Sequence, residues 1–225
     1  MSNDSQPEAS TTEDFILIEG KQLLSSFMFT DPLMREIYEK VFCCITEERA
    51  QHPFSITSSR TAAKLGIDTE KGILLVGTAG VGMSVLFRTI QQVLDGTDMQ
   101  FKTVSQQTIC SRVNRDIAAK YEILYEYGKN LHKDLLVDDI DPDREHEELK
   151  QTMQYIYDER QKLHLFKGYK TYLTMTFSTN GKDDPTSQAH NFLLRAYGRY
   201  IYDLLTKMCN ILVWEGTNLR STAAR

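Results

Sequence analysis

The chain has 225 residues and a formal net charge of −5, from 26 lysine and arginine residues against 31 aspartate and glutamate residues. Its 41% hydrophobic and 25% charged residues are close to the globular average, which excludes a collagen-like, fibrous or wholly disordered chain. The acidic balance excludes a surface that binds polyanions everywhere, so any nucleic-acid contact must come from a local patch. No apolar run approaches the roughly 18 residues that a membrane span needs, so we expect no membrane contact.

The N-terminal part of the chain is expected to differ from the rest. Residues 1–14 are polar and acidic and lack the features of a signal peptide, which predicts a disordered tail. Residues 15–70 are expected to form a helical segment and linker. The four cysteines, Cys43, Cys44, Cys110 and Cys209, match neither a disulfide framework nor a zinc site. We therefore expect reduced, mostly buried thiols, which is typical of a cytoplasmic protein.

A helix is predicted to begin at Asp31-Pro32, because apolar residues then recur every four positions along one stripe. Two interpretations of this stripe stay open. It presents a docking surface to a partner such as a replicative helicase, or it packs on the core. The stripe consists of Leu33, Ile37, Val41 and Ile45.

From residue 71 onward, short apolar runs alternate with amphipathic helices, which predicts an α/β domain with a parallel sheet over residues 71–225. The expected strands are 73–76, 101–104, 135–137, 172–177 and 211–214. The expected helices are 84–94, 106–125, 145–163 and 190–208.

The strongest local signal lies between the first expected strand and the helix that follows it. It reads Gly77-Thr78-Ala79-Gly80-Val81-Gly82-Met83-Ser84, the phosphate-loop frame G-x-x-x-x-G-K-[ST] with one substitution. The glycines let backbone N–H groups point at phosphates, and the serine hydroxyl binds Mg²⁺. Met83 removes a cation whose phosphate contact corresponds to about 4 kcal/mol at ~4 Å and an effective dielectric of ~20, before desolvation. A glycine-rich turn without a ligand is the alternative.

Polar residues also end two later strands. Asp138 and Asp139 follow the strand 135–137 and have the form of a Walker B pair. Asp138 is predicted to hold Mg²⁺ and Asp139 to orient or deprotonate the attacking water. Asn180, after the strand 172–177, is placed to bind that water or the γ-phosphate. The alternative for the acids is that they belong to a solvated cluster that favours the start of the next helix. The alternative for Asn180 is an asparagine in a turn.

With the helix motif Tyr197-Gly198-x-Tyr200 and a glycine-rich stretch ending at Arg220, residues 72–220 resemble the AAA+ ATPases of the bacterial helicase-loader type, the DnaC/IstB-like group. The resemblance implies a P-loop NTPase fold, a three-layer parallel sheet with flanking helices. It also implies ATP with Mg²⁺ as the ligand, a homo-oligomer, a replicative helicase or transposase as partner, and a role in DNA replication or transposition.

The resemblance also implies a role for each residue of the site. Nucleotide binding falls to the loop 77–84 and Arg220, the metal to Ser84 and Asp138, and catalysis to Asp139 and Asn180.

Three positions depart from the family pattern: Met83 at the lysine, and Tyr200 and Leu204 at arginines of the C-terminal helix. An arginine acting across a subunit boundary contributes ~10³–10⁵ in rate. We therefore expect ATP binding with impaired hydrolysis, and leave open whether the chain is an enzyme. A non-catalytic scaffold on the same fold is the alternative. Lys71 and Lys182 are candidates to replace the missing cation.

A basic face is predicted on the helix 106–125, where Arg112 and Arg115 lie three residues apart. These side chains are candidates to neutralise the phosphates of single-stranded DNA. The charge pattern favours the alternative, a solvated face balanced by Glu122 and Glu126. The tyrosines recur at helical spacing, which favours core or interface packing over a base-stacking surface.

Overall fold

The computed structural model describes residues 32–46, 65–97, 99–115, 117–129, 131, 133–141, 147–177 and 184–216. Five parallel strands form one sheet in the order β2-β3-β4-β1-β5. The strands are β1 Gly72–Gly77, β2 Lys102–Ser105, β3 Leu135–Ile140, β4 Thr171–Thr176 and β5 Cys209–Trp214. The helices are α2 Pro32–Thr46, α4 Met83–Val93, α5 Gln106–Val113, α6 Ile117–Ile123, the π-helix η1 Leu124–Lys129, α7 Glu147–Lys167 and α8 Pro185–Met208.

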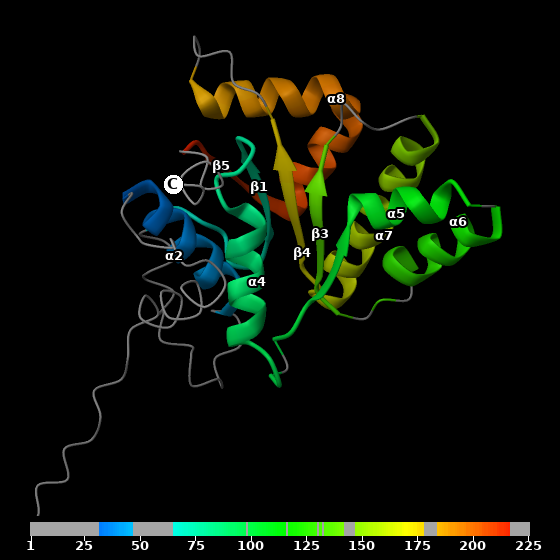
Figure 1. Cartoon of the computed structure of the whole chain (residues 1–225), viewed down its shortest axis with the longest axis horizontal. Helices are drawn as coiled ribbons and strands as arrows, with labels where there is room; N and C mark the ends of the chain where they lie inside the picture. Colours follow the sequence, from blue (N-terminus) through cyan, green and yellow to red (C-terminus); the bar gives the residue numbers. More distant parts are fainter. Residues whose placement is uncertain are drawn as a thin grey trace, which may run out of the picture.

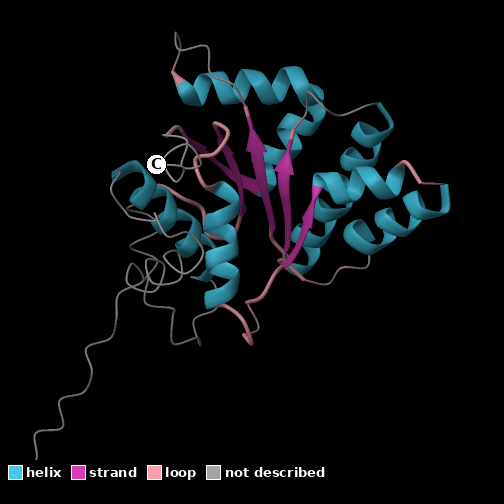
Figure 2. Ribbon diagram, in the orientation of Figure 1, coloured by secondary structure: helices cyan, strands magenta, loops and turns pink. Residues whose placement is uncertain are grey.

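Helices cover both faces of the sheet, which gives the molecule three layers (Figure 1, Figure 2). Side chains of β1 alternate between two apolar clusters. Leu74 and Val76 face the cluster that includes α5, α7 and α8, while Ile73 and Leu75 face the cluster of α2 and α4. All four side chains are fully buried, as a sheet covered on both faces requires. The predicted α/β fold, with a parallel sheet and flanking helices, is confirmed.

The strand order brings three chain segments to one edge of the sheet. β4 lies between β1 and β3, with Gly77 of β1 opposite Thr176 of β4 and Val137 of β3 opposite Leu173. Because all strands are parallel, the loop after β1 and the acids at the end of β3 lie at the same edge. That edge, outside the carboxyl ends of the strands, is where open α/β sheets bind ligands.

The apolar stripe of α2 packs on the core except at Leu33, which is 36% exposed. Ile37, Val41 and Ile45 are at most 3% exposed, and the ring of Tyr38 meets Trp214 of β5 edge-on, with centroids 5.9 Å apart. Of the two interpretations of this stripe, packing on the core therefore holds for these residues. Asp31 and the segment 1–14 lie outside the described residues.

The prediction of one helix over 106–125 is wrong. α5 ends at Val113 and α6 begins at Ile117, separated by a turn in which the Arg115 N–H donates to the Arg112 carbonyl at 3.1 Å. Asn114, a weak helix former, is the last residue to bond in the α-helical pattern.

One later helix begins elsewhere than expected. α8 begins at Pro185, where the Asp184 carboxylate accepts the Ser187 N–H at 2.9 Å. Aspartate before proline is a strong helix start, which is why the helix begins five residues before the predicted residue 190. α7 is described from Glu147 to Lys167, and its predicted start at residue 145 lies outside the described residues. None of the helices in the described ranges is both long enough and apolar enough to cross a membrane.

Candidate functional site

The loop between β1 and α4 is shaped by glycines. Gly80 and Gly82 have φ angles of 85° and 106°, a left-handed conformation that glycine adopts without steric cost. Gly82 precedes α4, and no side chain of the described residues caps that helix. The buried Thr78 hydroxyl likewise makes no hydrogen bond within the described part of the chain. The helix start and this hydroxyl are groups that an anion can use.

The side chain of Met83 turns inward. It is 7% exposed and belongs to the apolar cluster of α2 and α4. Its Sδ lies 3.0 Å from the position that a Cβ on Gly77 would occupy. Residue 83 therefore fills space beneath the loop, and a lysine there would have to leave that space to reach a phosphate.

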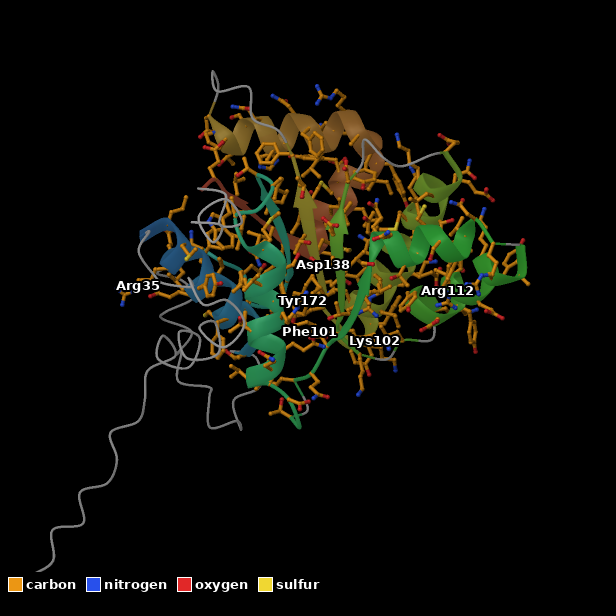
Figure 3. All side chains as sticks on the ribbon, viewed as in Figure 1. Arg35, Phe101, Lys102, Arg112, Asp138 and Tyr172 are labelled. Carbon is orange, nitrogen blue, oxygen red and sulfur yellow. The ribbon has the colours of Figure 1, made fainter. Side chains whose placement is uncertain are left out.

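The loop helix contacts the end of β3. Ser84 Oγ donates to Asp138 Oδ1 at 3.0 Å, although the two residues are 54 positions apart. The same oxygen accepts the Thr174 hydroxyl of β4 at 2.5 Å. Figure 3 shows Asp138 toward the carboxyl end of β3. Two motifs that the sequence presents separately thus form one cluster of oxygen atoms, the ligand type that Mg²⁺ prefers.

Asp139 lies in a β-bulge. The pairing of β3 with β4 steps from Val137 opposite Leu173 to Ile140 opposite Met175, so β3 holds one extra residue. Asp139 has φ of 60°, a conformation that aspartate tolerates better than most residues. Its N–H donates to Thr174 Oγ1 at 2.8 Å. The bulge changes the direction of the strand at this point and leaves the Asp139 side chain exposed.

Thr174 is the residue of this site that sequence reasoning did not assign a role. Its hydroxyl joins Asp138 and Asp139, and its side chain is 1% exposed. A hydroxyl inside the buried apolar run of β4 was the available signal, because buried polar groups need partners.

A hollow of about 510 Å³ opens beside the loop, within the range of ~300–1,000 Å³ that small-molecule sites occupy. At its rim, Gln106 Oε1 accepts the Asp141 N–H at 2.9 Å, which ties the start of α5 to the end of β3. The lining residues, all within the described ranges, include no lysine or arginine. They are Ala79, Gln106, Gln107, Cys110, Ser111, Asp139, Asp141, Leu149 and Thr176.

Other predicted site residues are not at this edge. Asn180, Lys182 and Arg220 lie outside the described residues. Lys71 precedes β1, at the opposite edge of the sheet, and its Nζ donates to the Thr206 carbonyl at 3.1 Å. The hypothesis that Lys71 replaces the missing cation is therefore wrong.

The two positions where the resemblance implies arginines both lie on α8. Leu204 is 3% exposed and lies in the cluster that includes α7 and α8. The Tyr200 hydroxyl donates to Asp158 of α7 at 2.7 Å.

The predicted DNA-binding arginines do not form a free basic face. Arg112 pairs with Glu126 at 2.8 Å and with Glu122 at 3.8 Å, and the hydrogen bond to Glu126 raises the Arg112 pKa. Arg115 is exposed beyond the end of α5. Figure 3 shows Arg112 at the side of the molecule formed by α5 and α6, away from Asp138. The alternative prediction, that Glu122 and Glu126 balance the charge of this helix face, is confirmed for Arg112.

No family model and no curated protein sequence matches the chain. A crystal structure of the DnaC helicase loader is similar with a TM-score of 0.49 and 15% identity, covering 80% of this chain and 98% of that chain. A structure of the E. coli MS115-1 HORMA:CdnC:Trip13 complex is similar with a TM-score of 0.43 and 13% identity, covering 89% of this chain and 68% of that chain.

Proposed function

We propose that this chain binds ATP with Mg²⁺ at the loop 77–84, as an AAA+ protein of the helicase-loader type in DNA replication or transposition. The contact of Ser84 with Asp138 carries the proposal. P-loop NTPases hold Mg²⁺ between the hydroxyl that follows the loop and the Walker B carboxylate, and these are the two groups in contact. Among the described residues, no side chain caps the start of α4 and none bonds the Thr78 hydroxyl, so both groups further suit a phosphate.

Each residue of the site has a role in this proposal. The backbone of 77–84 binds phosphates, Ser84 and Asp138 hold Mg²⁺, and Thr174 positions Asp138. Mg²⁺ supplies charge stabilisation to the phosphate oxygens. Asp139 orients the attacking water. Asn180 and Arg220 keep the roles that the resemblance implies, in water and nucleotide binding.

Hydrolysis is expected to be slow. In P-loop NTPases the loop lysine contacts the β- and γ-phosphates, and here residue 83 is a buried methionine. Leu204, buried in the core, cannot present a cation to a neighbouring subunit.

Equilibrium binding of ATP, with Mg²⁺ and with a chelator, tests the proposal. The chain should bind ATP at least about tenfold more tightly with Mg²⁺, and turn it over more slowly than ~1 s⁻¹. Asp138→Asn should remove the Mg²⁺ dependence, while the control Asp203→Asn, on the last turns of α8, should keep it. Absence of ATP binding would refute the nucleotide site, and turnover at ~1 s⁻¹ or faster would refute slow hydrolysis.

The alternative is a non-catalytic scaffold on the same fold, which the burial of Met83 favours. Met83→Lys separates the two. If this variant binds ATP more tightly than the parent chain but does not hydrolyse it, the arginine positions are the decisive defect. If neither protein binds ATP, the scaffold is the better description.

We also propose a homo-oligomer in the cytoplasm that contacts a replicative helicase or transposase, with residues 71–225 as the ATPase domain behind a helical segment 15–70. Single-stranded DNA is proposed to contact Arg115 and, in exchange for its pairing with Glu126, Arg112. In a plot of the logarithm of the DNA-binding constant against the logarithm of salt concentration, the double variant Arg112→Ala, Arg115→Ala should then have a shallower slope than the parent chain. An unchanged slope would leave Arg112 only its structural pairing with Glu126.

A further inference from the structure

The exposed face of α7 carries side chains that the nucleotide site does not use. Tyr155 is 41% exposed and Phe166 is 80% exposed. Eleven residues make about three helical turns, so these rings lie on the same side of α7, roughly 16 Å apart. Between them, on the same side, Lys162 and Glu159 form a salt bridge of 2.5 Å. Along this side the residues are therefore aromatic, acidic, basic and aromatic, with the Lys162 side chain 61% exposed and the Glu159 side chain 15% exposed at the border with η1.

Tyr155 also forms a wall of an aromatic groove of about 350 Å³. Its other walls are Tyr121 of α6 and Leu124, Tyr125 and Lys129 of η1. Tyr121 is 67% exposed and Tyr125 is 58% exposed. η1 packs closely on α7, because a Cβ on Gly128 would lie 3.3 Å from Glu159 Cβ and 3.6 Å from the Tyr155 ring. A contiguous exposed set of large apolar side chains marks an interaction site.

The face is complementary to itself in one register. If two copies of α7 pair in antiparallel directions with Phe166 of one against Tyr155 of the other, Glu159 of each meets Lys162 of the other. A shift of one turn brings Asp158 against Glu159 and Tyr155 against Lys162, which opposes like charges. The opposite shift brings Glu159 against Phe166. Only the first of these registers matches aromatic with aromatic and acid with base.

We propose that the chain forms a two-fold dimer through α7, with Phe166 of each copy seated in the groove of the other. Such an interface uses the same patch on both copies. α7 is 21 residues or about 31 Å long, and α6 and η1 lie beside it, while a standard interface needs ~800 Å² per partner. The dimer specifies the homo-oligomer of the proposed function and does not depend on ATP.

Analytical ultracentrifugation of the full chain without nucleotide, over a series of concentrations, measures this dimer. Wild-type protein should show a reversible monomer–dimer equilibrium. Phe166→Asp should weaken it at least about tenfold, because a ring in a central pocket carries much of such an interface. Leu33→Asp is the matched control, an exposed leucine on α2, and should leave the dimer unchanged.

A charge exchange separates contacts between copies from the salt bridge within one chain. Lys162→Glu and Glu159→Lys each oppose like charges in their own dimers and should each weaken dimerisation at least about tenfold. Mixing the two variants should restore a heterodimer, because acid meets base only across chains, while each chain keeps its like-charged pair. Arg199→Glu, at the exposed pair with Asp203, is the control and should have no effect.

Four results would overturn the inference. The first is a wild-type chain that stays monomeric at every concentration, and the second is a dimer that Phe166→Asp leaves intact. The third is a mixture of Lys162→Glu and Glu159→Lys that does not associate. The fourth is a monomer whose affinity for a single-stranded oligonucleotide falls in Tyr121→Ser and Tyr125→Ser, because the groove would then belong to nucleic acid. Loss of the dimer would not affect ATP binding, so the two proposals fail separately.

Discussion

Replacing Thr174 by valine removes one hydroxyl from the centre of the candidate site and keeps the shape of the side chain. That hydroxyl donates to the Asp138 carboxylate at 2.5 Å and accepts the Asp139 N–H at 2.8 Å. A hydrogen bond to a charged group contributes about 1.5–3 kcal/mol, so we expect a loss of about 2–3 kcal/mol in the free energy of unfolding. In a domain of this size that lowers Tm by roughly 4–12 °C.

Thr152→Val is the matched control for this substitution. Thr152 is as buried as Thr174, at 1% exposure, but its hydroxyl donates only to the Glu148 carbonyl one turn earlier in α7, at 2.9 Å. Loss of such a local bond should cost less than about 1 kcal/mol. Urea and thermal unfolding, followed by circular dichroism, measure both variants.

A difference of at least ~1 kcal/mol between the two valine variants is the expected result. ATP affinity with Mg²⁺ should also fall by roughly 10–100-fold in Thr174→Val and not in Thr152→Val, because groups that orient a metal ligand have effects of this size. Equal stabilities and equal ATP affinities would refute the role given to Thr174.

Two further predictions concern buried groups. Arg160→Met should lower the free energy of unfolding by about 3–5 kcal/mol, because the fully buried guanidinium donates to the Leu131, Lys133 and Lys170 carbonyls at 2.9–3.0 Å. The control Arg199→Met, at an exposed position, should cost less than about 1 kcal/mol. Urea unfolding measures both variants, and equal losses would contradict this reasoning. In native protein at neutral pH, Cys110 should react with a thiol reagent before Cys209 does. Cys110 is half-buried in the wall of the hollow, whereas burial raises the pKa of Cys209 well above its usual range. Preferential labelling of Cys209 would contradict this prediction.

Local patterns predicted most of the elements, because their causes are local. The strand over 73–76 lies within β1 and the helix over 84–94 coincides with α4 to within one residue, since a buried apolar run and an amphipathic period each identify their own element. The exception within this range is the helix 106–125. This segment is interrupted at Asn114-Arg115 and ends in the π-helix η1, whose Gly128 packs against α7, a contact between distant segments that no local pattern contains.

The arrangement of the site depends on pairing between distant strands. The sequence places Ser84 after one strand and Asp138 after another, but their contact requires β4 to lie between β1 and β3 and β3 to bulge at Asp139. The inward turn of Met83 likewise depends on the space above β1, which α2 and α4 enclose. Residue types at this edge were thus predictable, whereas their contacts were not.

A double-substitution cycle on ATP affinity tests the central claim most directly, that Ser84 and Asp138 hold one Mg²⁺ together. Ser84→Ala and Asp138→Asn should each weaken Mg²⁺-dependent ATP binding by roughly 10–100-fold. The double variant should be no weaker than the more damaging single variant by more than about threefold, because both side chains act on the same ion. Effects that multiply as those of independent sites, or single variants that bind as the parent chain does, would contradict the account.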